Sequence, residues 1–443
     1  SPIHQLAWRA LEFALTTSVL DRTCSEQPAS NPAPLRLGLL GLGTVGSAVA
    51  RLSRDAVPLF HSRGLAPVVS AAFVRDAARP RAASALTAFL TADVERFFAA
   101  PVDVVVEALG NAEPARTLVA RALEDGIPVV TANKTLIAAH GDELFDLARR
   151  RGTALRYEAT CIAGVPFLGT FERRPLASRV HGVTGILNGT SNAILTALSS
   201  GISFEAALAD AQRRGLAEPD PSADVTGGDA AQKLAILVRL FGHRSVIPSE
   251  IPAAPLDAID AQDVAAAAAF GGQLKPIAHA TWDDDRVRAF VSPAFVDQGH
   301  PLARVSHVTN GIVLDGENGA LCFVGPGAGP DVTAATLLDD VLEVATERAV
   351  RVPASAATRA AAVDHPGTRW FVRMPGSAPE AEIADLLGSF GLWCERLSTI
   401  RDRRYALTFA ATRERARAAA AALGSVTHAS VAAIPALTGE AAC

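Results

Sequence analysis

Residues 35–46, LRLGLLGLGTVG, decide the fold of this chain. The apolar half of the stretch is a predicted strand, the glycine-rich half is a turn, and residues 47–53 follow with a helical pattern. In a G-x-G-x-x-G turn the first glycine permits the tight bend, the second admits a pyrophosphate, and the third lets helix and strand pack closely. The helix N-terminus then supplies amide donors to the phosphates. The residues predicted to bind a dinucleotide are Gly41, Gly43, Thr44, Val45 and Gly46.

Strands and helices continue to alternate after this turn. Apolar runs occur at residues 68–74, 102–109 and 129–131, and residues 156–160 are expected to form one more strand. Continuous apolar strands separated by helices indicate a parallel sheet with both faces covered. We therefore expect an α/β fold whose first domain, residues 35–160, is a Rossmann-like, doubly wound nucleotide-binding domain.

The remaining sequence is expected to form two further domains. Residues 161–325 mix glycine- and asparagine-rich turns, helices and strand-like runs, which favours an α+β substrate-binding and dimerisation domain. Residues of about 326–350 are expected to rejoin the nucleotide-binding domain. Residues 366–443 show a β-α-β-β-α-β order typical of a ferredoxin-like module, although one strand is not visible in the pattern. Residues 1–34 are expected to be a loosely attached extension.

Composition excludes several functional classes. The net charge of -5 gives no basic surface for nucleic acid or an anionic membrane. No apolar stretch approaches the roughly 20 residues of a membrane span, and residues 1–34 lack the ordered regions of a secretory signal. The five cysteines are odd in number and lack a CxxC pair, which argues against a disulfide framework and a structural zinc site. We therefore predict a cytoplasmic protein.

Lysine is nearly absent, because only Lys134, Lys233 and Lys275 occur among 41 lysine and arginine residues. Arginine replaces lysine readily as a surface charge, but its guanidinium group stays protonated at physiological pH, whereas an ammonium group can lose its proton. The surviving lysines are therefore candidates for proton chemistry, and survival by chance is the alternative.

Two of these lysines lie in patterns that favour a ligand site. Lys134 follows a buried strand, so it projects from the carboxyl edge of the sheet, where α/β folds bind ligands. Lys233 lies four residues after Asp229, on the same face of a predicted helix. The upstream carboxylates Glu218 and Asp224 suit a cationic amino group, and a solvated helical salt bridge is the alternative for the Asp229–Lys233 pair.

The residue after the second predicted strand bears on the choice of cofactor. An acidic side chain at this place accepts from the ribose 2′-hydroxyl of NAD, whereas a guanidinium group suits the 2′-phosphate of NADP. Arg75 occupies the first position and Asp76 the next. Arg75 favours NADP, Asp76 leaves NAD open, and a solvated surface charge is the alternative for Arg75.

Residues 211–233, AQRRGLAEPDPSADVTGGDAAQK, resemble the signature of homoserine dehydrogenase. Supporting segments follow the order of that family, among them residues 188–192 (NGTSN) and 325–329 (GPGAG). The resemblance runs from about residue 35 to 350, and the C-terminal module is similar to the ACT domain that many members carry. It implies NAD(P)-dependent interconversion of L-aspartate 4-semialdehyde and L-homoserine, in the synthesis of threonine, methionine and isoleucine.

The same resemblance implies roles for individual residues. Lys233 matches the lysine of acid/base work, Lys134 the one between nicotinamide and substrate, and Asp229 one that orients Lys233. The matching substrate residues are Glu218, Asp224, Gly189 and Thr190, and Gly327 matches a cofactor residue. Two nearby ammonium groups are expected to depress each other's pKa toward neutrality. The family also implies a homodimer or homotetramer and a threonine effector, with a purely structural C-terminal module as the alternative.

A monovalent cation such as Na⁺ is implied at the turn around residue 162. The matching backbone carbonyls are those of Glu158, Cys161, Ala163 and Val165. Ile162 stands where the family has glycine, and a β-branched residue does not easily adopt a positive φ. If the cation site is retained, Ile162 is expected to have an ordinary backbone conformation.

Two other functions are compatible with the cofactor fold. Aspartate-semialdehyde dehydrogenase needs a nucleophilic cysteine with a partnering histidine, and Cys161, the cysteine near these motifs, has no histidine adjacent in sequence. A catalytically inactive NADP-binding regulator is expected to have lost Lys134 or Lys233, and both are present.

Overall fold

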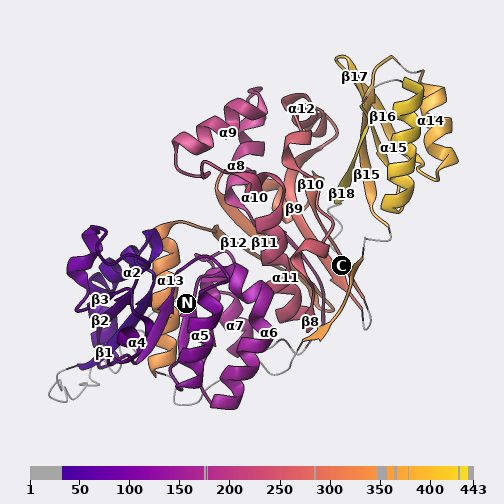
Figure 1. Ribbon diagram of the computed structural model, residues 1–443. Helices are drawn as coiled ribbons and strands as arrows, with labels where there is room; N and C mark the ends of the chain where they lie inside the picture. Colours follow the sequence, from indigo (N-terminus) through magenta and orange to yellow (C-terminus); the bar gives the residue numbers. More distant parts are fainter. Residues whose placement is uncertain are drawn as a thin grey trace, which may run out of the picture.

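The structure is a computed structural model that describes residues 32–173, 176, 178–283, 286–346, 357–363, 367–377, 379–427 and 430–437. The predicted N-terminal extension lies almost wholly outside these residues, and the first strand already begins at Ala33. Among the described helices, none is long and apolar enough to cross a membrane. In Figure 1 the N-terminal sheet, the central sheet and the C-terminal helices follow one another across the molecule.

The first sheet is parallel and has the strand order β3-β2-β1-β4-β5-β6. This is the order of a doubly wound Rossmann fold, as predicted. Its strands are β1 (Ala33–Leu40), β2 (Leu65–Phe73), β3 (Leu90–Thr91), β4 (Val104–Glu107), β5 (Val129–Thr131) and β6 (Leu155–Arg156). The helices are α2 (Thr44–Asp55), α3 (Val57–His61), α4 (Val94–Phe98), α5 (Ala115–Glu124) and α6 (Lys134–Arg151), with a 3-10 turn, η1 (Ala82–Leu86).

The prediction of a strand over residues 156–160 is wrong beyond Arg156. Residues Glu158–Thr160 form a 3-10 turn, η2. The main-chain N–H of Glu158 donates to the carboxylate of Asp340 at 3.2 Å rather than to a neighbouring strand. This tertiary contact takes the chain out of the sheet.

Both faces of the parallel sheet are buried, because its strands are apolar on both sides. Val104 and Val106 pack on one face against α2 and α13 (Pro330–Thr346), which lie side by side in Figure 1. Val105 packs on the other face in the cluster that contains α5 and α6. Helix α13 therefore packs on the N-terminal sheet, although it begins at Pro330, far beyond the last strand of that sheet, which ends at Arg156.

The second sheet is mixed and, among the described residues, contains ten strands, in the order β12-β11-β7-β9-β10-β18-β15-β17-β16 with β14 beside β10. Its central strands are β7 (Val180–Ile186), β9 (Gly272–Trp282), β10 (Val287–Asp297), β11 (Thr309–Gly316) and β12 (Gly319–Pro326), with β14 (Ala362–Val363). The helices nearby are α7 (Leu168–Arg173), α8 (Gly189–Leu198), α9 (Phe204–Arg213), α10 (Ser222–Val225), α11 (Gly228–Gly242) and α12 (Ala261–Ala269). Short elements are β8 (Arg244–Ser245), paired with β13 (Thr358–Arg359), and the turns η3 (Pro248–Glu250), η4 (Leu256–Ala258) and η5 (Pro301–Arg304).

The C-terminal residues form β15 (Arg369–Pro375), α14 (Glu380–Ser389), β16 (Cys394–Ile400), β17 (Arg403–Thr408), α15 (Arg413–Thr427) and β18 (Ala432–Leu437). This is the predicted β-α-β-β-α-β order, and β16 is the strand that the pattern did not reveal. Its side chains alternate poorly between buried and exposed, because β16 is the outer edge of the sheet. The module continues the central sheet, since β18 pairs in parallel with the end of β10.

A buried carboxylate joins this module to the central helices. Asp263 on α12 is fully buried, accepts from Arg373 at 2.6 Å and from the Tyr405 hydroxyl at 3.0 Å, and lies 3.4 Å from Arg403. The rings of Phe295, Phe371 and Tyr405 stack in succession beneath it. The C-terminal module is therefore packed against the body of the protein through both polar and aromatic contacts.

Candidate active site

The glycine turn has the geometry that phosphate binding requires. Gly41 has φ +101°, a conformation that L side chains rarely adopt. A Cβ atom added to Gly46 would lie 2.1 Å from the Gly41 carbonyl oxygen, whereas one on Gly43 would meet nothing within 4 Å. Gly43 caps helix α2 and has no side chain to satisfy its first amides. The N-terminus of α2 therefore presents free N–H donors beside an open approach to the backbone, which fits a pyrophosphate.

The loop after β2 places Arg75 and Asp76 differently. The Arg75 side chain is exposed at the carboxyl end of the strand. The Asp76 carboxylate instead accepts the N–H of Ala78 at 2.9 Å, within its own turn. Arg81 braces this turn by donating to the carbonyls of Asp76 and Arg79, both at 2.8 Å. The sequence did not single out Arg81, whose role depends on the folded shape of the loop.

Lys134 and Lys233, which are separated by almost a hundred positions, meet on one carboxylate. Lys134 is the first residue of α6 and its Nζ lies 3.1 Å from Asp229 Oδ1. Lys233 is on α11 and its Nζ lies 2.9 Å from Asp229 Oδ2. The Lys233 side chain is 10% exposed and that of Lys134 is 37% exposed, so the array opens on the Lys134 side.

The start of α8 completes this cluster. Lys233 Nζ donates to the Leu187 carbonyl at 2.7 Å. The Asn188 amide donates to Asp229 Oδ2 at 2.9 Å and to Asp224 Oδ1 at 2.7 Å, while its carbonyl oxygen caps α8. Asn188 is the first residue of the 188–192 segment, and the sequence pattern did not predict a role for it. Its role depends on the folded structure, which brings Asn188 into contact with Asp224 and Asp229.

Gly227 explains why Asp229 sits at the head of a helix. It has φ +85°, and a Cβ atom there would lie 2.7 Å from Val291 Cγ1. The tight left-handed turn lets α11 begin at Gly228, so Asp229 is in its first turn. A carboxylate near a helix N-terminus is also favoured by the helix dipole.

The electrostatics of the cluster differ from the prediction. Burial disfavours the charged form of Asp229, but Lys233, Lys134 and the Asn188 hydrogen bond outweigh it and hold the pKa of Asp229 far below its usual range. Burial is the largest influence on Lys134 and acts to lower its pKa, but the charge and hydrogen bond of Asp229, together with the charge of Asp224, outweigh burial and raise that pKa. The expectation that the two ammonium groups depress each other's pKa is therefore wrong for Lys134, because a carboxylate stands between them. Burial raises the pKa of Asp224.

The remaining predicted substrate residues lie around this cluster. Gly189 begins α8, and the Thr190 hydroxyl donates to the Leu216 carbonyl at 2.7 Å. The Glu218 side chain is exposed, and its main-chain carbonyl accepts from Gln212 at 3.2 Å. Asp224, Gly189 and Thr190 are thus brought to the lysines through Asn188 and α8, whereas no hydrogen bond found among the described residues brings the Glu218 carboxylate there.

The turn predicted to hold a cation lies under the loop that contains Gly327. The Ala163 N–H donates to the Gly327 carbonyl at 3.2 Å, and the Ala163 carbonyl accepts the Thr336 hydroxyl of α13. Ile162 has φ +39°, so the expectation of an ordinary conformation is wrong. The left-handed conformation costs roughly 1–2 kcal/mol, and burial of a side chain that is 1% exposed offsets a cost of that size.

Cys161 and Glu158 are both fixed by burial. Burial raises the pKa of the Cys161 thiol to about 12, so it is not a thiolate nucleophile at neutral pH. The Glu158 carboxylate accepts the N–H groups of Phe167, Leu168 and Gly169 at 2.8, 2.9 and 2.6 Å. These contacts tie the turn, whose residues are buried, to the start of α7.

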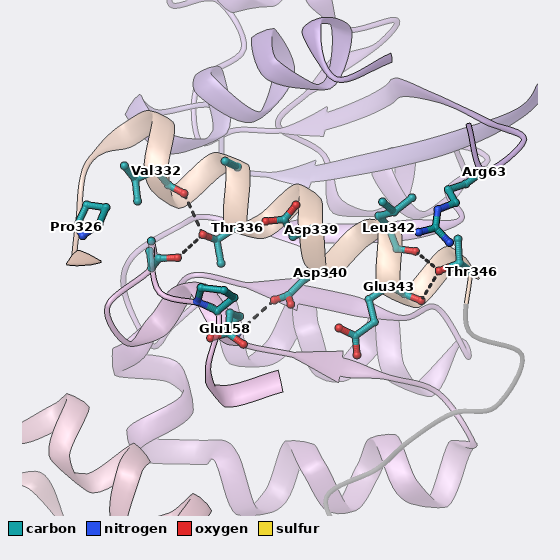
Figure 2. Close-up of a pocket in the computed structure, with 14 residues that line it drawn as sticks. Arg63, Glu158, Pro326, Val332, Thr336, Asp339, Asp340, Leu342, Glu343 and Thr346 are labelled. Atoms are coloured by element: carbon teal, nitrogen blue, oxygen red, sulfur yellow. Dashed lines mark hydrogen bonds between the residues drawn. The ribbon is translucent and has the colours of Figure 1, made fainter. Parts of the chain in front are cut away.

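A cavity of about 600 Å³ lies between this turn and α13. Figure 2 shows Asp340 pointing toward Glu158, with Arg63 at the far end. Burial raises the pKa of Asp340 well above its usual range. None of the three lysines lines this cavity, so it is separate from the Lys134–Asp229–Lys233 cluster.

Comparison with known proteins identifies the family. Residues 41–158 match the family model described as "Homoserine dehydrogenase, NAD binding domain", and residues 166–342 match the one described as "Homoserine dehydrogenase". The homoserine dehydrogenase of Synechocystis is 37% identical over 319 residues, which cover 70% of this chain and 73% of that protein. That of Corynebacterium glutamicum is 37% identical over 342 residues, covering 74% and 76%. The chain belongs to the homoserine dehydrogenase family.

Solved structures agree with this assignment. The crystal structure of a homoserine dehydrogenase from Thiobacillus denitrificans has a TM-score of 0.82 at 28% identity and covers 92% of this chain and 99% of that one. A homoserine dehydrogenase from S. aureus has a TM-score of 0.76 at 26% identity, covering 91% and 99%. The chain is therefore an oxidoreductase with a nucleotide-binding domain, and the rival assignment as aspartate-semialdehyde dehydrogenase finds no support in Cys161.

Proposed function

We propose that the chain interconverts L-homoserine and L-aspartate 4-semialdehyde with a nicotinamide cofactor. The observation that carries the proposal is the Lys134–Asp229–Lys233 array, which lies at the carboxyl edge of the parallel sheet and next to the start of α8. When bound, the dinucleotide supplies or accepts the hydride. The chain must then bind the amino-acid end of the substrate and move one proton at its oxygen.

The residues divide this work. Lys233 is proposed to exchange the proton with the substrate oxygen, while Asp229 and the Leu187 carbonyl fix its ammonium group. Lys134, the more exposed lysine, is proposed to lie between nicotinamide and substrate. The substrate's amino end is proposed to bind Asp224, Glu218 and the loop of Gly189 and Thr190. Glu218 is exposed in this structure, so its carboxylate has to turn toward the substrate.

The cofactor is proposed to bind the glycine turn, with Gly327 and Lys134 toward its nicotinamide end. NADP is the proposed form. Support comes from the Asp76 carboxylate, which already accepts an N–H of its own turn, and from the exposed side chain of Arg75 beside it. NAD is the alternative that the following variant separates.

Replacing Arg75 by alanine is expected to raise KM for NADP by about tenfold or more and to leave KM for NAD near its wild-type value. A hydrogen bond to a charged group contributes about 1.5–3 kcal/mol, and the lost partner is a phosphate that NAD lacks. Initial rates with each cofactor measure the two constants. Arg54→Ala, an exposed arginine at the other end of α2, is the matched control. Equal changes for both cofactors would exclude a role for Arg75 in discrimination.

The finer assignments follow from the same resemblance. A monovalent cation is proposed at the carbonyls of Glu158, Cys161, Ala163 and Val165 from the resemblance alone. The positive φ of Ile162 departs from the ordinary conformation expected of a retained site. Replacing Na⁺ by a bulky organic cation in the assay tests the cation proposal.

The proposed domains are residues 35–160 with 326–350, residues 161–325, and residues 366–443. The last is proposed to be an ACT-like regulatory module with threonine as effector. A homodimer or homotetramer in the cytoplasm is proposed.

One assay tests the central proposal. Homoserine-dependent reduction of NADP and of NAD is measured with and without threonine. We expect turnover with homoserine and a higher kcat/KM with NADP. Cofactor binding without turnover would instead support the inactive regulator.

A further inference from the structure

Lys275 is a buried lysine that the proposed chemistry does not use. It lies on β9, opposite Ala294 of β10, and is 3% exposed. Its Nζ donates to the Val305 carbonyl at 2.7 Å. No salt bridge to Lys275 occurs among the described residues, and burial lowers its pKa to about 8. An ammonium group placed in the core with a single carbonyl partner calls for an explanation other than stability.

Its partner belongs to a short segment, residues 305–310, that helix α8 also holds. The Asn192 amide donates to the Thr309 carbonyl at 3.1 Å and to the Val305 carbonyl at 3.4 Å. The His307 N–H donates to the Thr196 hydroxyl at 3.0 Å. Within the segment His307 has φ +57°, which turns the chain back on itself. The segment is therefore tied to β9 by Lys275 and to α8 by two polar side chains.

The 305–310 segment also contacts both loops that are proposed to hold ligands. A Cβ atom on Gly189 would lie 2.8 Å from the Val308 carbonyl oxygen and 3.3 Å from Asn310 Oδ1. One on Gly327 would lie 2.1 Å from Asn310 Oδ1. Both glycines thus lie directly against the segment, so a shift of the segment would move the start of α8 and the loop of Gly327.

Lysine suits position 275 better than arginine would, apart from the hydrogen bond to the Val305 carbonyl. In a chain where nearly every cation is arginine, lysine persists here at a site with 3% exposure. A guanidinium group is larger and cannot be discharged, whereas the slim ammonium group fits between strands and reaches one carbonyl. The length and small head group of lysine therefore account for Lys275 at this position, without a role in proton transfer.

We propose that Lys275 is a positioning residue of the substrate site, which fixes the 305–310 segment beneath the start of α8. Through that segment it sets the place of Gly189 and Thr190 relative to Lys233. The inference rests on the proposed role of Gly189 and Thr190 in binding homoserine. Lys275 is proposed to act through this segment, because its Nζ donates to the Val305 carbonyl and not to a residue of the Lys134–Asp229–Lys233 cluster.

Lys275→Met tests the proposal, because methionine has nearly the same length and is apolar. We expect KM for homoserine to rise about tenfold, as the loss of a charged hydrogen bond implies. We expect kcat and the cofactor dissociation constant, measured by quenching of protein fluorescence, to change much less than this KM, because Lys233 and the cofactor turn at Gly41–Gly46 lie outside the segment. Thr196→Val, which removes the hydroxyl at the other end of the segment, should raise the same KM, and the two effects combined should be less than multiplicative.

Leu387→Ala is the control for simple destabilisation, since Leu387 is fully buried on α14 in a separate cluster. It should lower the melting temperature without changing KM for homoserine. Unchanged KM in both Lys275→Met and Thr196→Val, with wild-type enzyme active on homoserine, would overturn the positioning role. If Lys275→Met does not fold, the KM of Thr196→Val decides alone. Wild-type protein that does not oxidise homoserine would overturn the proposed function instead.

Discussion

Lys233→Arg is expected to lower kcat for homoserine oxidation by at least about a hundredfold, since a positioned acid/base group contributes about 10²–10⁴-fold. Arginine keeps the positive charge but does not release a proton at physiological pH. It also cannot place a single N–H donor group between Asp229 and the Leu187 carbonyl, which lie 2.9 and 2.7 Å from Lys233 Nζ. Steady-state rates with saturating cofactor and homoserine measure the loss.

Two further variants separate proton transfer from charge. Lys233→Met should lose as much kcat as Lys233→Arg, because both lack a titratable amine. Small primary amines added to Lys233→Ala should restore part of kcat, with a dependence on pH that follows the pKa of the added amine. Cofactor binding should be retained in all of them. If Lys233→Arg turns over at close to the wild-type rate, the proton-transfer role is wrong and Lys233 only holds charge.

Asp229→Asn is expected to reduce both turnover and stability. Asparagine has the same shape but removes the negative charge between Lys134 and Lys233, which leaves two ammonium groups facing each other. Removing one partner of a buried ion pair typically destabilises by about 3–5 kcal/mol. Thermal unfolding measures the stability, and kcat should fall because Lys233 loses the group that orients it. Asp210→Asn, an exposed carboxylate paired with Arg213 on α9, is the control and should change little.

The stability difference should depend on pH in a defined direction. The pKa of Asp229 in the folded protein is held far below its usual range. Its contribution is therefore complete above the ordinary carboxylate pKa of about 4 and is lost as pH falls toward the folded value. Melting temperatures of wild type and Asp229→Asn should accordingly differ most near neutral pH and converge below about pH 4. A constant difference down to pH 3 would show that the charge of Asp229 is not what stabilises the fold.

The glycine turn and the Rossmann order could be predicted from sequence because they depend on local geometry. Gly41 and Gly46 are needed within one turn of chain, and apolar strands buried on both faces leave a continuous pattern. The edge strand β16 was not predicted because none of its residues is fully buried and exposed residues lie on both of its faces, so it leaves no alternating pattern. The strand predicted at residues 156–160 ends at Arg156, and the N–H of Glu158 donates to the carboxylate of Asp340, a residue far along the chain that the local pattern could not reveal.

From the sequence alone we predicted the glycine turn, the two lysines of the signature segments, and Asp229 one helical turn before Lys233 as site residues. The folded structure was needed to show that Lys134 shares the same carboxylate, that Asn188 joins Asp229 to Asp224, and that Lys275 donates to the Val305 carbonyl. The physical reason is distance. Charge interactions depend on separations of a few ångströms, and chain position does not give these for residues a hundred positions apart. The sign of the Lys134 pKa shift, opposite to that expected, was set by one carboxylate lying between two amines.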